Sequence, residues 1–199
     1  MSLVDVWMTS QKAMVVVDTE GLGSDGRYTE CSKLLTLSHA NVVMAIRGGD
    51  LFLHALTTSL RSAAGFDEAE DDLPASLAFV TESLKPMPHV TEIHKQEVTM
   101  VGYSRSRGSM CCLVAQSHDE TGFSFQEITD LYLSPWDASW GQEGIHARSP
   151  GQAHAIAAEQ VERTLTMLPE APVGGRLLLA EVTRDDCRVS VLGRVTTRG

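Results

Sequence analysis

The sequence predicts an α+β fold in which two antiparallel β-sheets pack face to face and helices cover both outer faces, a four-layer α-β-β-α sandwich. Segments with strand and helix patterns come in blocks: four strands, two helices, three strands, one helix and two strands. Residues 110–115 are apolar on both faces, which is typical of a strand in a sheet covered on both sides. Because only short turns separate neighbouring strand segments, we expect antiparallel pairing. No interdomain linker is evident, so a single domain over residues 1–199 is expected.

The first fifty residues contain the four strands of the first block. Residues 4–8 and 13–18 are extended apolar segments joined by a polar turn, which predicts a β-hairpin. The glycine-rich stretch 21–26 is interpreted as a flexible turn, because neither a helix nor a Lys-Ser/Thr pair follows it as a phosphate-binding loop would require. Residues 33–37 and 41–46 supply the remaining two strands.

The period then changes to that of a helix. Apolar residues recur every three to four positions after Asp50, a good N-cap residue, and this predicts a helix that Gly65 ends; they are Leu53, Leu56, Leu60 and Ala64. The acidic stretch 67–72 is expected to be a solvated connection. Leu77, Val80 and Leu84 predict a second helix that stops before Pro86 and Pro88.

The second half repeats the alternation of strands and helices. Residues 98–103, 110–115 and 123–133 predict three strands, with a polar turn at 104–107 between the first two. Ser149, Pro150 and Gln152 form a capping box ahead of a helix that reaches Leu168. Residues 176–182 and 187–192 predict a closing hairpin.

Composition excludes several classes of partner. The net charge of −10 argues against binding to nucleic acid or to an anionic membrane, because both need clustered Lys and Arg. Apolar runs are much shorter than the roughly 20 residues of a membrane span, and no signal peptide is recognised, so a cytoplasmic protein is expected. The four cysteines fit no zinc or disulfide spacing, and Cys111 and Cys112 are predicted to be buried. The seven histidines form no HxH or HExxH motif, so neither a metal nor another cofactor is expected.

Short motifs in a fixed order run through most of the chain. An apolar strand ends in Asp-Thr at 18–19, Lys-Leu-Leu stands at 33–35, and Met-Ala-Ile-Arg-Gly-Gly-Asp at 44–50 precedes a helix. Val-Gly-Tyr-Ser at 101–104, Leu-Val-Ala at 113–115 and Gly-Gly-Arg at 174–176 follow. This order resembles the proteasome-type branch of the N-terminal nucleophile (Ntn) hydrolases, which includes proteasome β subunits and HslV-like peptidases.

The resemblance implies an amide bond hydrolase whose N-terminal residue is the nucleophile. Carried over to this sequence, the catalytic residues would be Ser2, Asp18, Lys33 and Gly48. Ser2 would be the nucleophile and its α-amine the base, since an N-terminal amine has a pKa of about 8. Lys33 would activate the nucleophile, Asp18 would orient Lys33, and the Gly48 N–H would stabilise the oxyanion. Asp18 lies 16 residues after Ser2 and 15 before Lys33, which is close to the spacing of the family.

Two residues beside this set have alternative interpretations. Arg47 is placed next to the expected cleft, where its guanidinium would bind a substrate carboxylate, or it is a surface side chain at a strand end. Cys31 lies near Lys33 and could be a nucleophile, although a structural cysteine is the favoured interpretation.

Two functions are therefore open at this point. The first is a hydrolase of a peptide or a small amide. The alternative is a catalytically inactive relative that self-assembles or acts as a scaffold, as proteasome α-type subunits do. The alternative is favoured by the Ser at the position of the usual Thr and by the lack of a recognisable supporting serine motif. A homo-oligomer is expected in either case.

Overall fold

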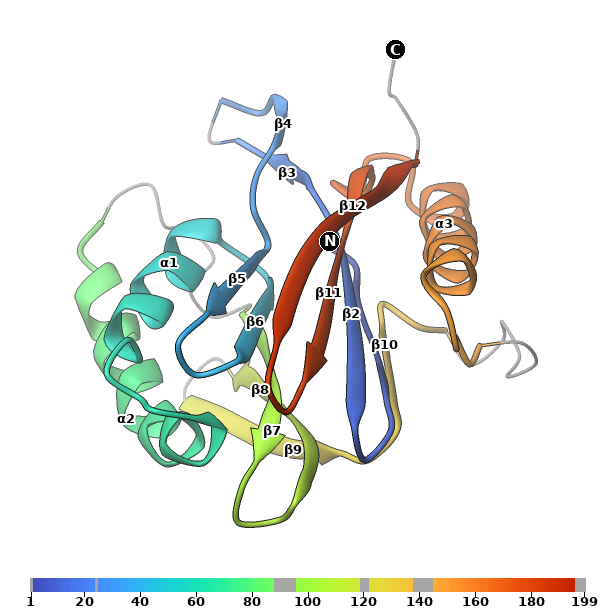
Figure 1. Cartoon of the computed structure of the whole chain (residues 1–199). Coiled ribbons are helices and arrows are strands. Elements are labelled where there is room, and N and C mark those ends of the chain that lie inside the picture. Colours follow the sequence, from blue (N-terminus) through green and yellow to red (C-terminus); the bar gives the residue numbers. More distant parts are fainter. Residues whose placement is uncertain (1, 24, 88–95, 119–121, 138–144, 196–199) are drawn as a thin grey trace.

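Two five-stranded antiparallel sheets form the centre of the molecule (Figure 1). The computed structural model describes residues 2–23, 25–87, 96–118, 122–137 and 145–195. The first sheet has the strand order β10-β1-β2-β11-β12, with β1 (Val4–Met8), β2 (Lys12–Asp18), β10 (Leu131–Ser134), β11 (Gly175–Thr183) and β12 (Cys187–Val195). The second sheet has the order β5-β6-β7-β8-β9, with β5 (Leu34–Leu37), β6 (Val42–Arg47), β7 (Glu97–Ser104), β8 (Ser109–His118) and β9 (Gly122–Ile128).

The two sheets face each other across a shared apolar core. Alternate residues of a strand point to opposite faces, so Val4 and Val6 of β1 enter this core, whereas Leu3 and Trp7 point to the outer face. The second sheet contributes Val43 and Ala45 of β6, among others, from its inner face. The inner core therefore joins residues that are far apart in the sequence.

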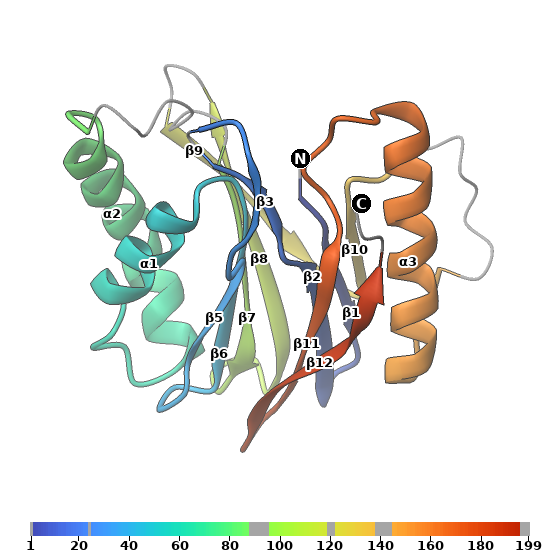
Figure 2. The same cartoon turned by 90° about the horizontal axis from the view of Figure 1, so that it is seen from above.

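Helices cover the outer face of each sheet. Helices α1 (Asp50–Ser59) and α2 (Phe66–Leu84) pack on the second sheet through apolar side chains that include Leu53, Leu56 and Leu73, and α3 (Pro150–Met167) packs on the first sheet through Ala157 and Val161. Figure 2 shows α1 and α2 on one side of the paired sheets and α3 on the other. The predicted α+β class with mainly antiparallel strands is confirmed.

Several local predictions are also confirmed. The Ser149 side chain accepts a hydrogen bond from the Gln152 N–H, which confirms the N-cap, while the Gln152 side chain accepts from the N–H of Arg148, one residue before the N–H of Ser149 that a capping box would use. Cys111 and Cys112 are buried. The polar stretch 104–107 forms the turn between β7 and β8.

The helical region differs from the prediction in its boundaries. The first helix ends at Ser59 rather than near Gly65, and α2 begins at Phe66, so the acidic stretch 67–72 is helical and not a connection. The physical reason is that Phe66, Ala69 and Leu73 share one face at helical spacing and are buried. Acidic residues in the first turn also stabilise the N-terminal end of a helix.

One strand prediction is corrected, and two short strands are added. The stretch 123–133 is not one strand, because β9 pairs with β8 in the second sheet and β10 pairs with β1 in the first. The glycine-rich stretch that begins at Gly21 leads into a turn, as predicted, and this turn joins two short strands that were not predicted, β3 (Glu20–Leu22) and β4 (Tyr28–Glu30). The turn is closed by the Gly23 N–H, which donates to the Arg27 carbonyl, and by Gly26 at a φ of +75°.

Candidate active site

Asp18 and Lys33 form a buried ion pair between the two sheets. Asp18 is the last residue of β2 and Lys33 directly precedes β5, and their side chains are 0% and 2% exposed. Lys33 Nζ lies 2.9 Å from Asp18 Oδ1 and 2.8 Å from Oδ2, and it also donates to the Glu20 carbonyl. The ammonium group, which has three N–H donors, is therefore surrounded by three acceptors.

The Asp18 carboxylate has two further donors. The Leu3 N–H donates to Oδ1 at 2.8 Å and the Gly174 N–H donates to Oδ2 at 2.9 Å. Burial raises the pKa of Asp18, while Lys33 and these two backbone donors oppose that rise. Asp18 thus accepts hydrogen bonds from Leu3 just before β1, from Gly174 just before β11, and from Lys33 just before β5.

Ser2 directly precedes Leu3, whose N–H binds the Asp18 carboxylate, and it is 7% exposed. Its carbonyl accepts a hydrogen bond from Arg47 Nε at 2.8 Å. The Nη1 of Arg47 donates to Glu97 Oε2 at 3.0 Å and to the Ser134 hydroxyl. The guanidinium predicted to bind a substrate carboxylate is therefore bonded to the carbonyl of Ser2 and to two polar side chains of the protein.

Gly48 follows Arg47 at the end of β6 and adopts a φ of +152°, a conformation that side chains rarely permit. A Cβ atom built on Gly48 would lie 2.1 Å from the side-chain oxygen of Gln96. That oxygen accepts a hydrogen bond from the Gly49 N–H at 2.9 Å. Both the backbone conformation and the close approach of Gln96 require glycine here.

The structure brings the predicted residues together to different degrees. Asp18 contacts Lys33 directly and reaches Ser2 through the neighbouring peptide group of Leu3. Gly48 is linked to Ser2 through its sequence neighbour Arg47, whose Nε donates to the Ser2 carbonyl. Sequence reasoning missed Glu97 and Ser134, since an acid at a strand start and a serine at a strand end look like ordinary surface residues.

Asp5 is a buried acid behind this site that the sequence analysis did not single out. It is 0% exposed, and neither carboxyl oxygen has a hydrogen-bond partner among the residues that the structure describes. Burial raises the pKa of Asp5 well above its ordinary value, and Asp18 adds to the rise, whereas Gln160, the Ser134 backbone and Arg47 oppose it. Gln160 Oε1 also lacks a hydrogen-bond partner within the described part of the chain, so two buried polar side chains here have oxygen atoms without a partner.

Other candidate chemistry is less well supported. Within the described ranges, no group of three or more His, Cys, Asp or Glu residues could hold a metal ion, and His89 and His94 lie outside those ranges. Burial raises the pKa of Cys31 despite the nearby Lys33, which disfavours a reactive thiolate.

No helix in the described residues is long and apolar enough to cross a membrane.

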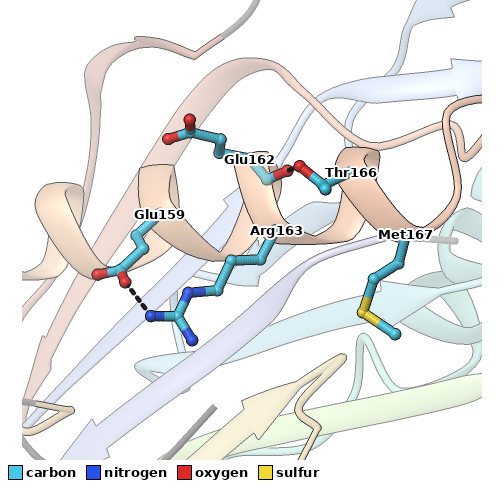
Figure 3. A pocket seen from close by; sticks show the side chains of 5 residues that line it. All are labelled: Glu159, Glu162, Arg163, Thr166 and Met167. Carbon is cyan, nitrogen blue, oxygen red and sulfur yellow. Dashed lines mark hydrogen bonds and ion pairs between the residues drawn. The ribbon is translucent and has the colours of Figure 1, made fainter. Parts of the chain in front are cut away.

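A pocket on the exposed side of α3 contains none of the predicted site residues. It is lined by Glu159, Glu162, Arg163, Thr166 and Met167. Figure 3 shows these side chains along the helix, with an ion pair between Glu159 and Arg163. We assign it no role in catalysis.

Comparison with solved structures shows which fold this is. Anbu, described as an ancestral beta-subunit, from Yersinia bercovieri is 14% identical with a TM-score of 0.67, over 100% of this chain and 88% of that chain. A Gly-1 mutant of Anbu from Hyphomicrobium sp. strain MC1 is 14% identical with a TM-score of 0.65, over 97% and 87% of the two chains. A further structure of Anbu from this strain is 12% identical with a TM-score of 0.64, over 96% and 87%.

These matches show that the chain has a proteasome-related fold. They extend over nearly the whole chain, and at this level of identity they show the fold alone. No family model and no curated protein matches the sequence.

Proposed function

We propose that the chain is an Ntn hydrolase with the four-layer proteasome-like architecture, and that it cleaves an amide bond in a peptide or small amide. The observation that carries this proposal is a shared carboxylate oxygen. Asp18 Oδ1 accepts hydrogen bonds from both the Leu3 N–H, at 2.8 Å, and Lys33 Nζ, at 2.9 Å. Leu3, the residue after Ser2, and Lys33, the predicted activating lysine, thus donate hydrogen bonds to the same oxygen atom of Asp18.

The proposed reaction begins once Met1 has been removed and the α-amine of Ser2 is free. Ser2 Oγ attacks the carbonyl carbon of the substrate and its proton passes to the α-amine, whose pKa of about 8 suits a base near neutral pH. The positive charge of Lys33 favours the alkoxide form of the nucleophile, and Asp18 fixes the position of that charge.

The second half of the reaction uses the same groups. The Gly48 N–H donates to the oxyanion of the tetrahedral intermediate. The C–N bond then breaks, and the leaving nitrogen takes the proton held by the α-amine. Water attacks the resulting ester on Ser2, releases the acid and regenerates the hydroxyl.

A peptide β-lactone, which acylates nucleophilic hydroxyl groups, tests this proposal. The protein is prepared with Met1 removed, as verified by intact mass, and then treated with the probe. We expect one adduct, absent in Ser2→Ala and formed more slowly in Lys33→Met. Ser10→Ala, which changes an exposed turn residue, is the matched control and should label like the wild type. No adduct, or an adduct that persists in Ser2→Ala, would contradict the proposal.

We also propose that the protein forms a homo-oligomer. Light scattering of the same preparation measures this independently of labelling. An oligomer that forms no adduct would favour the alternative function, a self-assembling or scaffold relative without catalysis.

A further inference from the structure

The peptide group between Ser2 and Leu3 is held at both of its polar ends. Its carbonyl accepts from Arg47 Nε at 2.8 Å, and its N–H donates to Asp18 Oδ1 at 2.8 Å. Both partners are charged groups, and hydrogen bonds to charged groups are the stronger kind. The Cα atom of Ser2 lies in the plane of this peptide group. The orientation of the peptide group therefore sets the position of the atom from which the Ser2 side chain extends.

Arg47 is itself fixed by groups from both sheets. Glu97 lies directly opposite Arg47 in the pairing of β6 with β7, and its Oε2 is 3.0 Å from Nη1. The Ser134 hydroxyl, which also accepts from Nη1, belongs to β10 of the other sheet, where Ser134 lies opposite Val4. The planar guanidinium therefore connects the second sheet, which contributes Gly48, with the first sheet, which begins at Ser2.

The contacts of Arg47 point to a role that differs from carboxylate binding. Its Nε and Nη1 atoms are used within the protein, and the side chain is 21% exposed. The bond from Arg47 to the Ser2 carbonyl does not involve the substrate. It instead affects the position of the nucleophile, and a misplacement of the nucleophile by about 1 Å can cost on the order of 100-fold in rate.

We propose that Arg47 is a positioning residue that, together with Asp18, clamps the Ser2–Leu3 peptide group and so aims the nucleophile at the substrate carbonyl. The inference rests on the proposed function for its catalytic consequence. The clamp itself is a structural statement that can be tested without turnover.

Hydrogen exchange measures the clamp directly. In Arg47→Met, amide exchange in the segment 2–8 should become at least about 10-fold faster, while exchange in β7 and β8 stays close to that of the wild type. Arg47→Lys serves as a second variant that keeps a charge beside Glu97. A lysine has one nitrogen and cannot reproduce the fork that serves the Ser2 carbonyl and Glu97 together, so the same segment should still exchange faster.

Labelling kinetics with the β-lactone measure the catalytic consequence. Arg47→Met should lower the maximal rate of inactivation by about 10- to 100-fold and leave the half-saturating probe concentration unchanged. Millimolar guanidinium should restore part of that rate in Arg47→Ala. Arg107→Met, which removes another partly buried, ion-paired arginine on the β7–β8 turn, is the matched control and should change neither quantity.

The possible results separate the two proposals. Unchanged exchange in the segment 2–8 of both Arg47 variants would overturn the clamp. A change only in the half-saturating concentration would also overturn it, because that result indicates substrate binding by Arg47. If the wild type forms no adduct, the proposed function fails, and the exchange measurement still decides whether Arg47 holds the peptide group.

Discussion

Replacing Lys33 by methionine would leave the Asp18 carboxylate buried without its counter-charge. At the observed separation of 2.8 Å the attraction between the two charges is about 6 kcal/mol for an effective dielectric constant of about 20. The cost of desolvating both groups offsets much of this attraction. When Lys33 alone is removed, the attraction is lost but the cost of desolvating Asp18 remains. We therefore expect Lys33→Met to lower the free energy of unfolding by about 3–5 kcal/mol at pH 8.

The same substitution should make stability depend on pH with a defined sign. Without Lys33, burial raises the pKa of Asp18 in the folded state above its value of about 3.9 in the unfolded chain. The folded state then binds more protons than the unfolded state, so stability falls as the pH rises through this interval. The deficit of Lys33→Met relative to the wild type should thus be smaller at pH 5 than at pH 8.

Urea unfolding at the two pH values tests this reasoning. Lys85→Met removes an ion pair to Glu82 in which the side chains are 48% and 69% exposed, and as the control it should cost less than about 1 kcal/mol. The double variant Asp18→Asn/Lys33→Met removes the stranded charge and should recover part of the loss. A cost below about 1 kcal/mol for Lys33→Met at pH 8, or an equal cost at both pH values, would refute the account of a tightly coupled buried pair.

Three further predictions concern single residues. Asp5→Asn should stabilise the protein by about 1 kcal/mol or more at pH 8 and by less near pH 4, because burial raises the pKa of Asp5 and the folded state loses stability as that carboxyl ionises; thermal melts that show no pH-dependent difference would contradict this. Gly48→Ala should cost about 1–3 kcal/mol in urea unfolding and displace Gln96, whereas Gly49→Ala, where a Cβ meets nothing within 4 Å, should cost less than about 1 kcal/mol. Ser149→Ala should cost about 1 kcal/mol through loss of the N-cap of α3, and an unchanged denaturation midpoint would count against the capping bond.

The fold class could be predicted because it depends on local periodicity. The alternation of strands and the capping box at Ser149 are readable from a few neighbouring residues. The helical start of α2 was missed because charged residues dominate the composition of 67–72, although Phe66, Ala69 and Leu73 have helical spacing. The division of 123–133 between two sheets depends on which strand edges are free, and no local pattern carries that information.

The site was predictable only in part for similar reasons. Asp18 and Lys33 could be paired through the resemblance to a family, and the structure places them in contact. The direction of the Arg47 side chain was not predictable, because a strand-end arginine can point to solvent or between the sheets. Its partners Glu97 and Ser134 come from strands that are distant in sequence and meet only in the folded protein.

The central claim is that Ser2 acts with both its hydroxyl and its α-amine, and a peptide epoxyketone tests it most directly. Such a probe carries two electrophilic centres, and a residue with a free hydroxyl and a free amine closes a ring by adding to both. Tandem mass spectrometry of the labelled protein without Met1 should locate one adduct of the full probe mass on Ser2, attached through both atoms. An adduct elsewhere, or no adduct in a correctly folded protein, would contradict the account.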